Sequence, residues 1–194
     1  MNLRLDTTAE SIPTAAYTVR RGVPADAADL ASFAARTFTD TYGEYNSPAN
    51  LAMHLTSTYS LAQQTRELGD AGIVTLLAHR YAQLVAYAQV RRGPPPPCVG
   101  GAAPVELLRF YVDKSHHGAG VAQRLFEEAR RAAAALGGAE LWLKVWERNP
   151  RAIAFYRKCG FVDVGVADFF VGVDRQTDRV LVLDLRDGPA RTPS

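Results

Sequence analysis

Two glycines stand where a strand pattern gives way to a helix pattern, in the stretch FYVDKSHHGAGVAQRLF (residues 110–126). A helix N-terminus carries unpaired N–H groups and the positive end of the helix dipole, and it therefore binds phosphate readily. Gly118 and Gly120 remove side chains that would hold an anion away from those N–H groups. The spacing predicts a phosphate cradle made of main chain.

Two common phosphate motifs do not match this stretch. The pattern GxxxxGK[ST] is absent from the chain, and the dinucleotide fingerprint GxGxxG would need glycine at the position of Gln123. The strand pattern also ends too early for the dinucleotide motif. A nucleotide-binding domain stays open as an alternative, and stronger stabilisation by ATP or NAD than by coenzyme A would favour it.

Composition limits the remaining classes of protein. The chain has 194 residues and is 47% hydrophobic, which predicts one domain with a sizeable core. Its net charge is +2, and its Lys and Arg residues are scattered, so no nucleic-acid partner is expected. No apolar segment approaches membrane-spanning length, and the first residues contain no apolar signal, so we expect a cytoplasmic protein without a membrane partner. Two cysteines without metal-site spacing predict no metal.

The sequence predicts one domain, residues 15–187, preceded by a flexible leader (1–14) and followed by a tail (188–194). Within this domain, predicted strands alternate with predicted helices, and these elements must position the glycine turn. The proline-rich segment 93–104 predicts a stiff surface loop. Ser47 and Ser60 predict helix starts, the second as a capping box. Predicted strands cover 17–21, 73–78, 84–90, 105–112, 141–146, 161–166 and 180–185, and predicted helices follow residues 24, 47, 60, 120 and 149.

Two ordered motifs give the chain a family resemblance. The turn HGAGVA (117–122) after the strand ELLRFYV resembles the pyrophosphate loop of the GNAT superfamily of N-acetyltransferases, and NPRAIAFYRKCGF (149–161) resembles its second signature. The resemblance covers about residues 15–186, with one departure: the family usually has Arg or Gln where this chain has His117. The segments FFVGVDRQTDRVLVLDL and LWLKVWERNPRAIAFY also resemble a bacterial branch that contains polyamine acetyltransferases.

The resemblance implies a fold and a donor. The fold would be α/β (α+β) and GNAT-like: a central mixed, strongly twisted, mostly antiparallel sheet of six to seven strands, flanked by helices and splayed between strands four and five. The donor would be acetyl-CoA. Its diphosphate would meet the turn, and its pantetheine arm would meet the bulged fourth strand and the side-chain amide of Asn149. A helix N-cap is the alternative role for Asn149, and the two roles are compatible. The residues implied to bind the donor are Phe110, Tyr111, Val112, His117, Gly118, Ala119, Gly120, Val121, Ala122, Asn149, Ala152, Phe155 and Tyr156.

Acetyl transfer to an amine also needs proton transfers. A primary amine has a pKa near 10, so few molecules are nucleophilic at pH 7 without help. The resemblance places a base at Glu106, acting through water, although a strand glutamate can equally orient the substrate or form an ion pair. It places the acid that reprotonates the sulfur at Tyr156, for which a core tyrosine is the alternative.

Other reactive side chains receive lesser roles. His116 is expected to be a solvated turn residue, Cys159 to pack rather than to carry an acyl group, and Asp174 and Asp178 to shape the turn of the closing hairpin. The aromatic pair Trp142 and Trp146 is expected to pack the sheet, with an amine cage as the alternative. A loop after the first predicted helix could bind a cationic acceptor or could simply be a polar surface loop, and both stay open; its residues are Asp40, Tyr42, Glu44 and Tyr45.

These expectations combine into one function. The predicted enzyme moves an acetyl group to a primary amine of a small molecule (polyamine-like) or a peptide, by direct transfer in a ternary complex. A non-catalytic module that binds acyl-CoA is the alternative. The acceptor and the oligomeric state stay open, and homodimers are common in the family.

Overall fold

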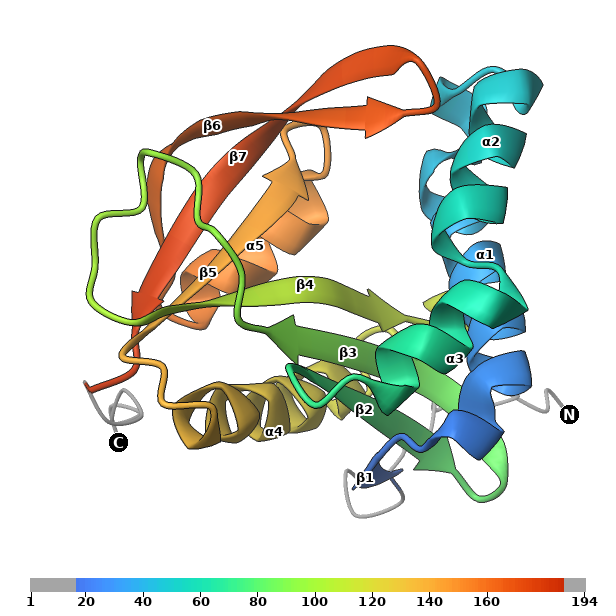
Figure 1. Ribbon diagram of the computed structural model, residues 1–194, viewed down its shortest axis with the longest axis horizontal. Helices are drawn as coiled ribbons and strands as arrows, with labels where there is room; N and C mark the ends of the chain where they lie inside the picture. Colours follow the sequence, from blue (N-terminus) through green and yellow to red (C-terminus); the bar gives the residue numbers. More distant parts are fainter. Residues whose placement is uncertain (1–16, 187–194) are drawn as a thin grey trace, which may run out of the picture.

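A single seven-stranded sheet organises the computed structural model, which describes residues 17–186; the predicted leader and tail lie outside these residues. The strand order is β1-β2-β3-β4-β5-β7-β6, and every neighbouring pair is antiparallel except β4–β5 (Figure 1). The strands are β1 (Tyr17–Arg21), β2 (Ile73–Arg80), β3 (Gln83–Arg91), β4 (Pro104–Val112), β5 (Glu140–Trp146), β6 (Val162–Val171) and β7 (Asp174–Asp184).

Five α-helices lie among the described residues: α1 (Ala27–Tyr42), α2 (Pro48–Thr58), α3 (Leu61–Gly69), α4 (Val121–Ala135) and α5 (Pro150–Lys158). The hydroxyls of Ser47 and Ser60 accept hydrogen bonds from the N–H groups of Asn50 and Gln63, at 3.2 and 3.3 Å, so both predicted helix starts are confirmed. Only half of the predicted capping box forms, because the Gln63 side-chain oxygen accepts a hydrogen bond from Arg66 instead of one from the Ser60 N–H. None of these helices is long and apolar enough to cross a membrane.

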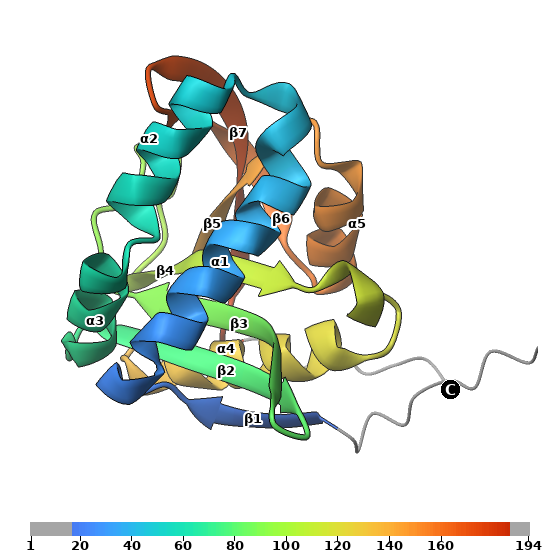
Figure 2. The ribbon, with the colours of Figure 1, turned by 90° about the vertical axis from the view of Figure 1, so that its right-hand side faces the viewer.

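The helices cover the sheet in two layers. On one face α4 packs against a core of β2, β3, β4 and β5 side chains, and its buried Leu125 and Ala129 follow the apolar stripe that the sequence predicts. On the other face α1 brings Leu30, Phe33 and Phe38 against Leu77 and Tyr87. Figure 2 shows α1 and α3 on one side of strands β2–β4 and α4 on the other.

The sheet splits where the parallel pair begins. β4 and β5 pair at only three positions, ending with Glu106 opposite Trp142, and then diverge (Figure 1). On its other edge, β4 has an irregularity against β3 beside Leu107, where the register shifts between Gln89 and Val90. The predicted fold, including the splay between strands four and five, is confirmed. An unpaired edge of β4 therefore faces the gap.

Two expectations about local structure are wrong. The closing hairpin is longer than predicted, and its turn lies at Gly172 and Val173, so Asp178 stands within β7 and is buried. His116 is not solvated: its side chain is buried and its Nδ1 bonds to the Tyr17 hydroxyl at 3.0 Å. In both cases the residues alone resemble turn chemistry, and only long-range packing reveals the burial.

The proline-rich segment has no helix or strand between residues 93 and 103, as predicted, but it is not only a surface loop. Val99 is buried against Trp142 and Val180. The segment therefore covers part of β5 and β7 on the face opposite α5, and Trp142 packs the sheet, as the sequence favours.

Candidate active site

A cavity of about 260 Å³ occupies the gap between β4 and β5. It extends from the glycine turn, along α5, to the end of α1. Most residues that the sequence predicts for the donor line this cavity: Phe110, Tyr111, Val112, His117, Gly118, Ala122, Asn149, Ala152, Phe155 and Tyr156.

The glycine turn presents main chain to the cavity. Gly118 and Gly120 have φ angles of 77° and 83°, a left-handed conformation that glycine adopts without strain. Among the described residues, no acceptor bonds to the N–H groups of Gly118, Gly120, Val121 or Ala122. A Cβ at Gly118 would meet nothing within 4 Å, so the space before the turn is free for a ligand. The turn thus has the free amides and the room that a phosphate group needs.

His117 holds the turn against β4 and α5. Its Nε2–H donates to the Val112 carbonyl at 3.1 Å, and its Nδ1 accepts a hydrogen bond from Arg151. These two bonds require the neutral ring, and burial, followed by the Arg151 charge, lowers the pKa of His117. His117, which replaces the family's usual Arg or Gln, is therefore an uncharged side chain that fixes the position of the turn. The positive charge on this part of the cavity wall comes from Arg151.

Tyr156 lines the cavity from α5, and its side chain is otherwise enclosed. Its ring packs edge-on against Phe110 and Phe161, at centroid distances of 6.3 and 5.6 Å. Burial raises the pKa of Tyr156 well above that of a free phenol, with a smaller contribution from Tyr42. The phenol therefore stays protonated at neutral pH, which is the state a proton donor needs.

Asn149 joins the helix start to the cavity. Its side-chain oxygen accepts a hydrogen bond from the Ala152 N–H at 3.1 Å, which caps α5. The side chain also lies close to the Tyr42 hydroxyl and lines the cavity. Capping uses only the side-chain oxygen, so the amide nitrogen stays available as a donor, and capping and ligand binding are compatible.

Four predicted residues do not line the cavity: Glu106, Ala119, Gly120 and Val121. For the last three the prediction concerns only main chain, and the Val121 side chain is fully buried in the core. Glu106 is 3% exposed, and its Oε2 accepts a hydrogen bond from Arg91 Nε at 2.7 Å. Glu106 is thus already neutralised by a cation.

The cavity also contains residues for which the sequence analysis predicts no role. Arg151 and Gln123 line the end near the turn, and Thr41, Lys144 and Val145 line the opposite end, where Tyr42 also lies. A basic residue two positions after a helix-capping asparagine could have indicated Arg151. No local pattern marks Lys144, because its position depends on how β5 diverges from β4.

A buried ion pair supports the face of the sheet beneath α3. Arg109 of β4 binds Glu67 of α3 and also donates to the Gln89 side chain. Both charged side chains are about nine-tenths buried, and the guanidinium lies 5.2 Å from the Tyr59 ring centroid. Despite the cost of burial, Arg109 keeps the pKa of Glu67 below its ordinary value.

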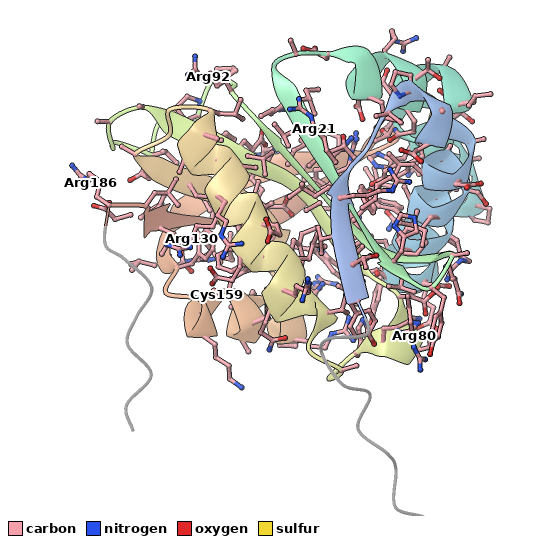
Figure 3. All side chains as sticks on the ribbon, turned by 90° about the horizontal axis from the view of Figure 1, so that it is seen from below. Arg21, Arg80, Arg92, Arg130, Cys159 and Arg186 are labelled. Carbon is pink, nitrogen blue, oxygen red and sulfur yellow. The ribbon has the colours of Figure 1, made fainter. Side chains whose placement is uncertain are left out.

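Cys159 lies at the end of α5, near α4, and does not line the cavity (Figure 3). Burial raises the pKa of its thiol to about 11, so the thiolate is scarce at neutral pH. The structure therefore agrees with a packing role. Among the described residues there is no group of three or more His, Cys, Asp and Glu side chains that could hold a metal ion.

Residues 34–161 match the acetyltransferase (GNAT) family model, and the chain belongs to that family. It is 32% identical over 160 residues to an uncharacterised N-acetyltransferase of Mycobacterium tuberculosis, covering 82% of this chain and 98% of the relative. It is 30% identical over 156 residues to one from Lactobacillus delbrueckii subsp. lactis, covering 79% and 90%.

Solved structures share the fold. The PaiA N-acetyltransferase of Thermoplasma acidophilum, solved in complex with coenzyme A, superposes with a TM-score of 0.69 at 21% identity and covers 87% of this chain and 98% of its own. The protein yncA of Salmonella typhimurium, solved with acetyl-CoA, has a TM-score of 0.62 at 19% identity, with coverage of 92% and 99%. At these identities the likeness concerns the fold.

Proposed function

We propose that this protein transfers the acetyl group of acetyl-CoA to a primary amine, by direct attack within a ternary complex. One observation carries the proposal: a single cavity joins the free amides of the glycine turn to the Tyr156 hydroxyl and continues to the far side of the sheet. Two structural neighbours were solved with coenzyme A or acetyl-CoA, which supports the same donor here.

The donor would lie between β4 and α5. The free N–H groups of Gly118, Gly120, Val121 and Ala122 would bind its diphosphate, with Arg151 adding a positive charge beside them. The unpaired edge of β4 beyond Glu106 offers main-chain groups, at Phe110 and Val112, to the pantetheine arm and the thioester carbonyl. One Val112 carbonyl lone pair is already used by His117.

The proton that the sulfur needs would come from Tyr156. Its raised pKa keeps the phenol protonated, and its position on the cavity wall places it beside the predicted path of the pantetheine arm. The proton that the acceptor loses needs a base at the end of the cavity where the acceptor binds. Glu106 stays a predicted base, but its ion pair with Arg91 favours a charge-balancing role.

Direct transfer is favoured over an acetyl-enzyme. Cys159 lies off the cavity and its thiol stays protonated. We expect Cys159→Ala to retain turnover, and intact mass spectrometry of the protein with acetyl-CoA alone to find no acetyl adduct. A stable adduct on a cavity residue, discharged by amine, would contradict direct transfer.

The acceptor class is a small amine of the polyamine kind or a peptide amine. The aromatic rings of Tyr42, Tyr45 and Trp146 pack together beside the far end of the cavity, with ring centroids 4.8 to 5.6 Å apart, as suits an organic cation. Of the three, Tyr42 lines the cavity. A cytoplasmic location and a homodimer are part of the same proposal.

The testing experiment measures thiol release from acetyl-CoA with a panel of polyamines, amino acids, aminoglycosides and peptides. The proposal expects release that depends on at least one amine, with the acetylated product found by mass spectrometry. Tight binding of acetyl-CoA without release for every amine would instead support the non-catalytic module.

A further inference from the structure

Asp178 is a buried carboxylate that the account so far does not use. It stands in the middle of β7, opposite Trp146 of β5 and Ala167 of β6. Its side chain is 5% exposed, and its Oδ1 has no hydrogen-bond partner among the described residues. A buried carboxylate oxygen without a donor is costly, so its presence needs an explanation.

Asp178 is not among the residues that line the cavity, but two residues near it are. Lys144 lies two residues from Trp146 on β5, so its side chain projects from the same face of the sheet as Asp178, and it lines the cavity. Tyr42 of α1 also lines the cavity; burial is the main cause that raises its pKa, and the charge of Asp178 raises it further. Burial likewise raises the pKa of Tyr156, with a smaller contribution from Tyr42. Tyr42 therefore lies within electrostatic range of both Asp178 and Tyr156.

Two charged residues affect Asp178, one positive and one negative. Burial is the main cause that raises its pKa, to about 6; Lys144 lowers this pKa, and Glu147, in the turn after β5, raises it. β6 presents only Ala167 opposite the carboxylate. The Lys144 ammonium lies 6.0 Å from the centroid of the Phe169 ring of β6.

We propose that Asp178 binds the ammonium group of the acceptor and takes the proton that this group loses before it attacks the thioester. The inference rests on the proposed acetyl transfer and names the base on its acceptor side. It favours Asp178 over Glu106 because Glu106 is already bound by Arg91, whereas Asp178 Oδ1 has no donor. It also favours a cationic acceptor, since a desolvated carboxylate opposite Trp146, whose ring packs against Tyr42 and Tyr45, suits an alkylammonium group.

The proton transfers balance. One proton moves from the acceptor nitrogen to the Asp178 carboxylate, and the neutral nitrogen forms its bond to the acyl carbon as the carbon–sulfur bond breaks. Tyr156 gives its proton to the leaving sulfur, and the resulting tyrosinate takes the second proton from the new amide nitrogen. Asp178 then releases its proton to solvent, so the net products are the amide, the thiol and one proton.

The first expected consequence is a pH profile. Asp178 must be ionised in the free enzyme, so kcat/KM for the acceptor should rise with pH through an apparent pKa near 6 and then level off. Asp178→Asn should remove this acidic limb and lower kcat/KM for the acceptor about 100-fold. The dissociation constant of coenzyme A should not change.

Three variants keep the test independent of whether Asp178→Asn is stable. Lys144→Gln removes the charge that lowers the Asp178 pKa, and should move the acidic limb to higher pH. Glu147→Gln removes the charge that raises it, and should move the limb to lower pH. Asp174→Asn, at the exposed start of the same strand, is the matched control and should change kcat/KM by no more than about twofold.

The pH profiles of the wild type and of these variants are measured with the amine that gives the fastest release of coenzyme A. The Glu106→Gln variant is measured in the same way. Opposite limb shifts in the Lys144 and Glu147 variants, with loss of the limb in Asp178→Asn, support the inference. An unchanged limb in Asp178→Asn, or a limb that only Glu106→Gln removes, overturns it while the acetyl transfer stands. A wild-type protein that acetylates no amine overturns the proposed function and, with it, this inference.

Discussion

The two ends of the cavity are built differently. The donor end comes from two continuous stretches, residues 110–123 and 149–156, and its principal groups are main-chain amides with Tyr156 beside them. The acceptor end is assembled from side chains on separate elements, Tyr42 on α1 and Lys144 on β5, with Asp178 of β7 near them. A site made of main chain depends on local conformation, whereas a site made of distant side chains depends on the whole fold.

The largest expected effect comes from Tyr156→Phe, at the meeting point of the two ends. Loss of a general acid lowers kcat about 100-fold or more, because the sulfur must leave without a proton. The KM for acetyl-CoA should change little, since the ring remains packed against Phe110 and Phe161. Steady-state kinetics at saturating amine measure both values, and an unchanged kcat would remove the acid role.

The next largest effect is expected at the buried ion pair of Arg109 and Glu67, which lies beneath α3. Arg109→Met leaves Glu67 buried and unpaired and should lower the free energy of unfolding by about 3–5 kcal/mol. The more exposed i,i+3 pair of Arg130 and Glu127 on α4 is the matched control, and Arg130→Met should cost less than about 1 kcal/mol. Urea unfolding measures both, and equal losses would contradict a special role for the buried pair.

The same pair predicts a dependence on pH. The folded-state pKa of Glu67 is lowered from 4.5, so its contribution is complete above pH 4.5 and is lost as the pH falls through the folded value. Wild-type protein should therefore lose more stability on acidification below pH 4.5 than Arg109→Met does. Parallel curves of unfolding free energy against pH would show that Arg109 does not lower this pKa.

A smaller effect is expected at the glycine turn. An alanine at position 118 relaxes out of the left-handed conformation, and restoring the turn for binding costs about 1–2 kcal/mol, so the affinity for coenzyme A should fall about tenfold. Gly100→Ala is the control, because Gly100 has neither a positive φ nor a close neighbour. Calorimetric titration measures both, and equal affinities would place the diphosphate elsewhere.

The smallest effect separates the two roles of Asn149. Asn149→Ser keeps a helix cap and should alter stability by a few tenths of a kcal/mol, whereas Asn149→Ala should cost about 1 kcal/mol. Both remove the amide from the cavity wall and should weaken the binding of coenzyme A to a similar degree. Wild-type affinity in Asn149→Ser would limit this residue to capping.

These differences explain what the sequence could predict. The turn, the helix caps at Ser47, Ser60 and Asn149, and the family motifs are local patterns, and the structure has them where expected. Periodicity indicated the strands and the α4 stripe for the same reason. The splay itself was expected only through the family resemblance.

The acceptor side could not be predicted in this way. Asp178 resembles a turn residue in the sequence, and its burial appears only when β7 pairs with β5 and β6 at once. His116 resembles a solvated turn residue until Tyr17, about a hundred positions earlier, bonds to it. The ion pair of Glu106 with Arg91 likewise requires the β3–β4 register.

The central claim is that the free amides of Gly118, Gly120, Val121 and Ala122 bind the donor's diphosphate and so bring its thioester to Tyr156. The most direct measurement compares the binding of acetyl-CoA with that of acetyl-pantetheine, which lacks the diphosphate, in wild type and in Gly118→Ala. The account predicts that Gly118→Ala weakens only the binding of acetyl-CoA. Equal weakening of both ligands, or of neither, would contradict it.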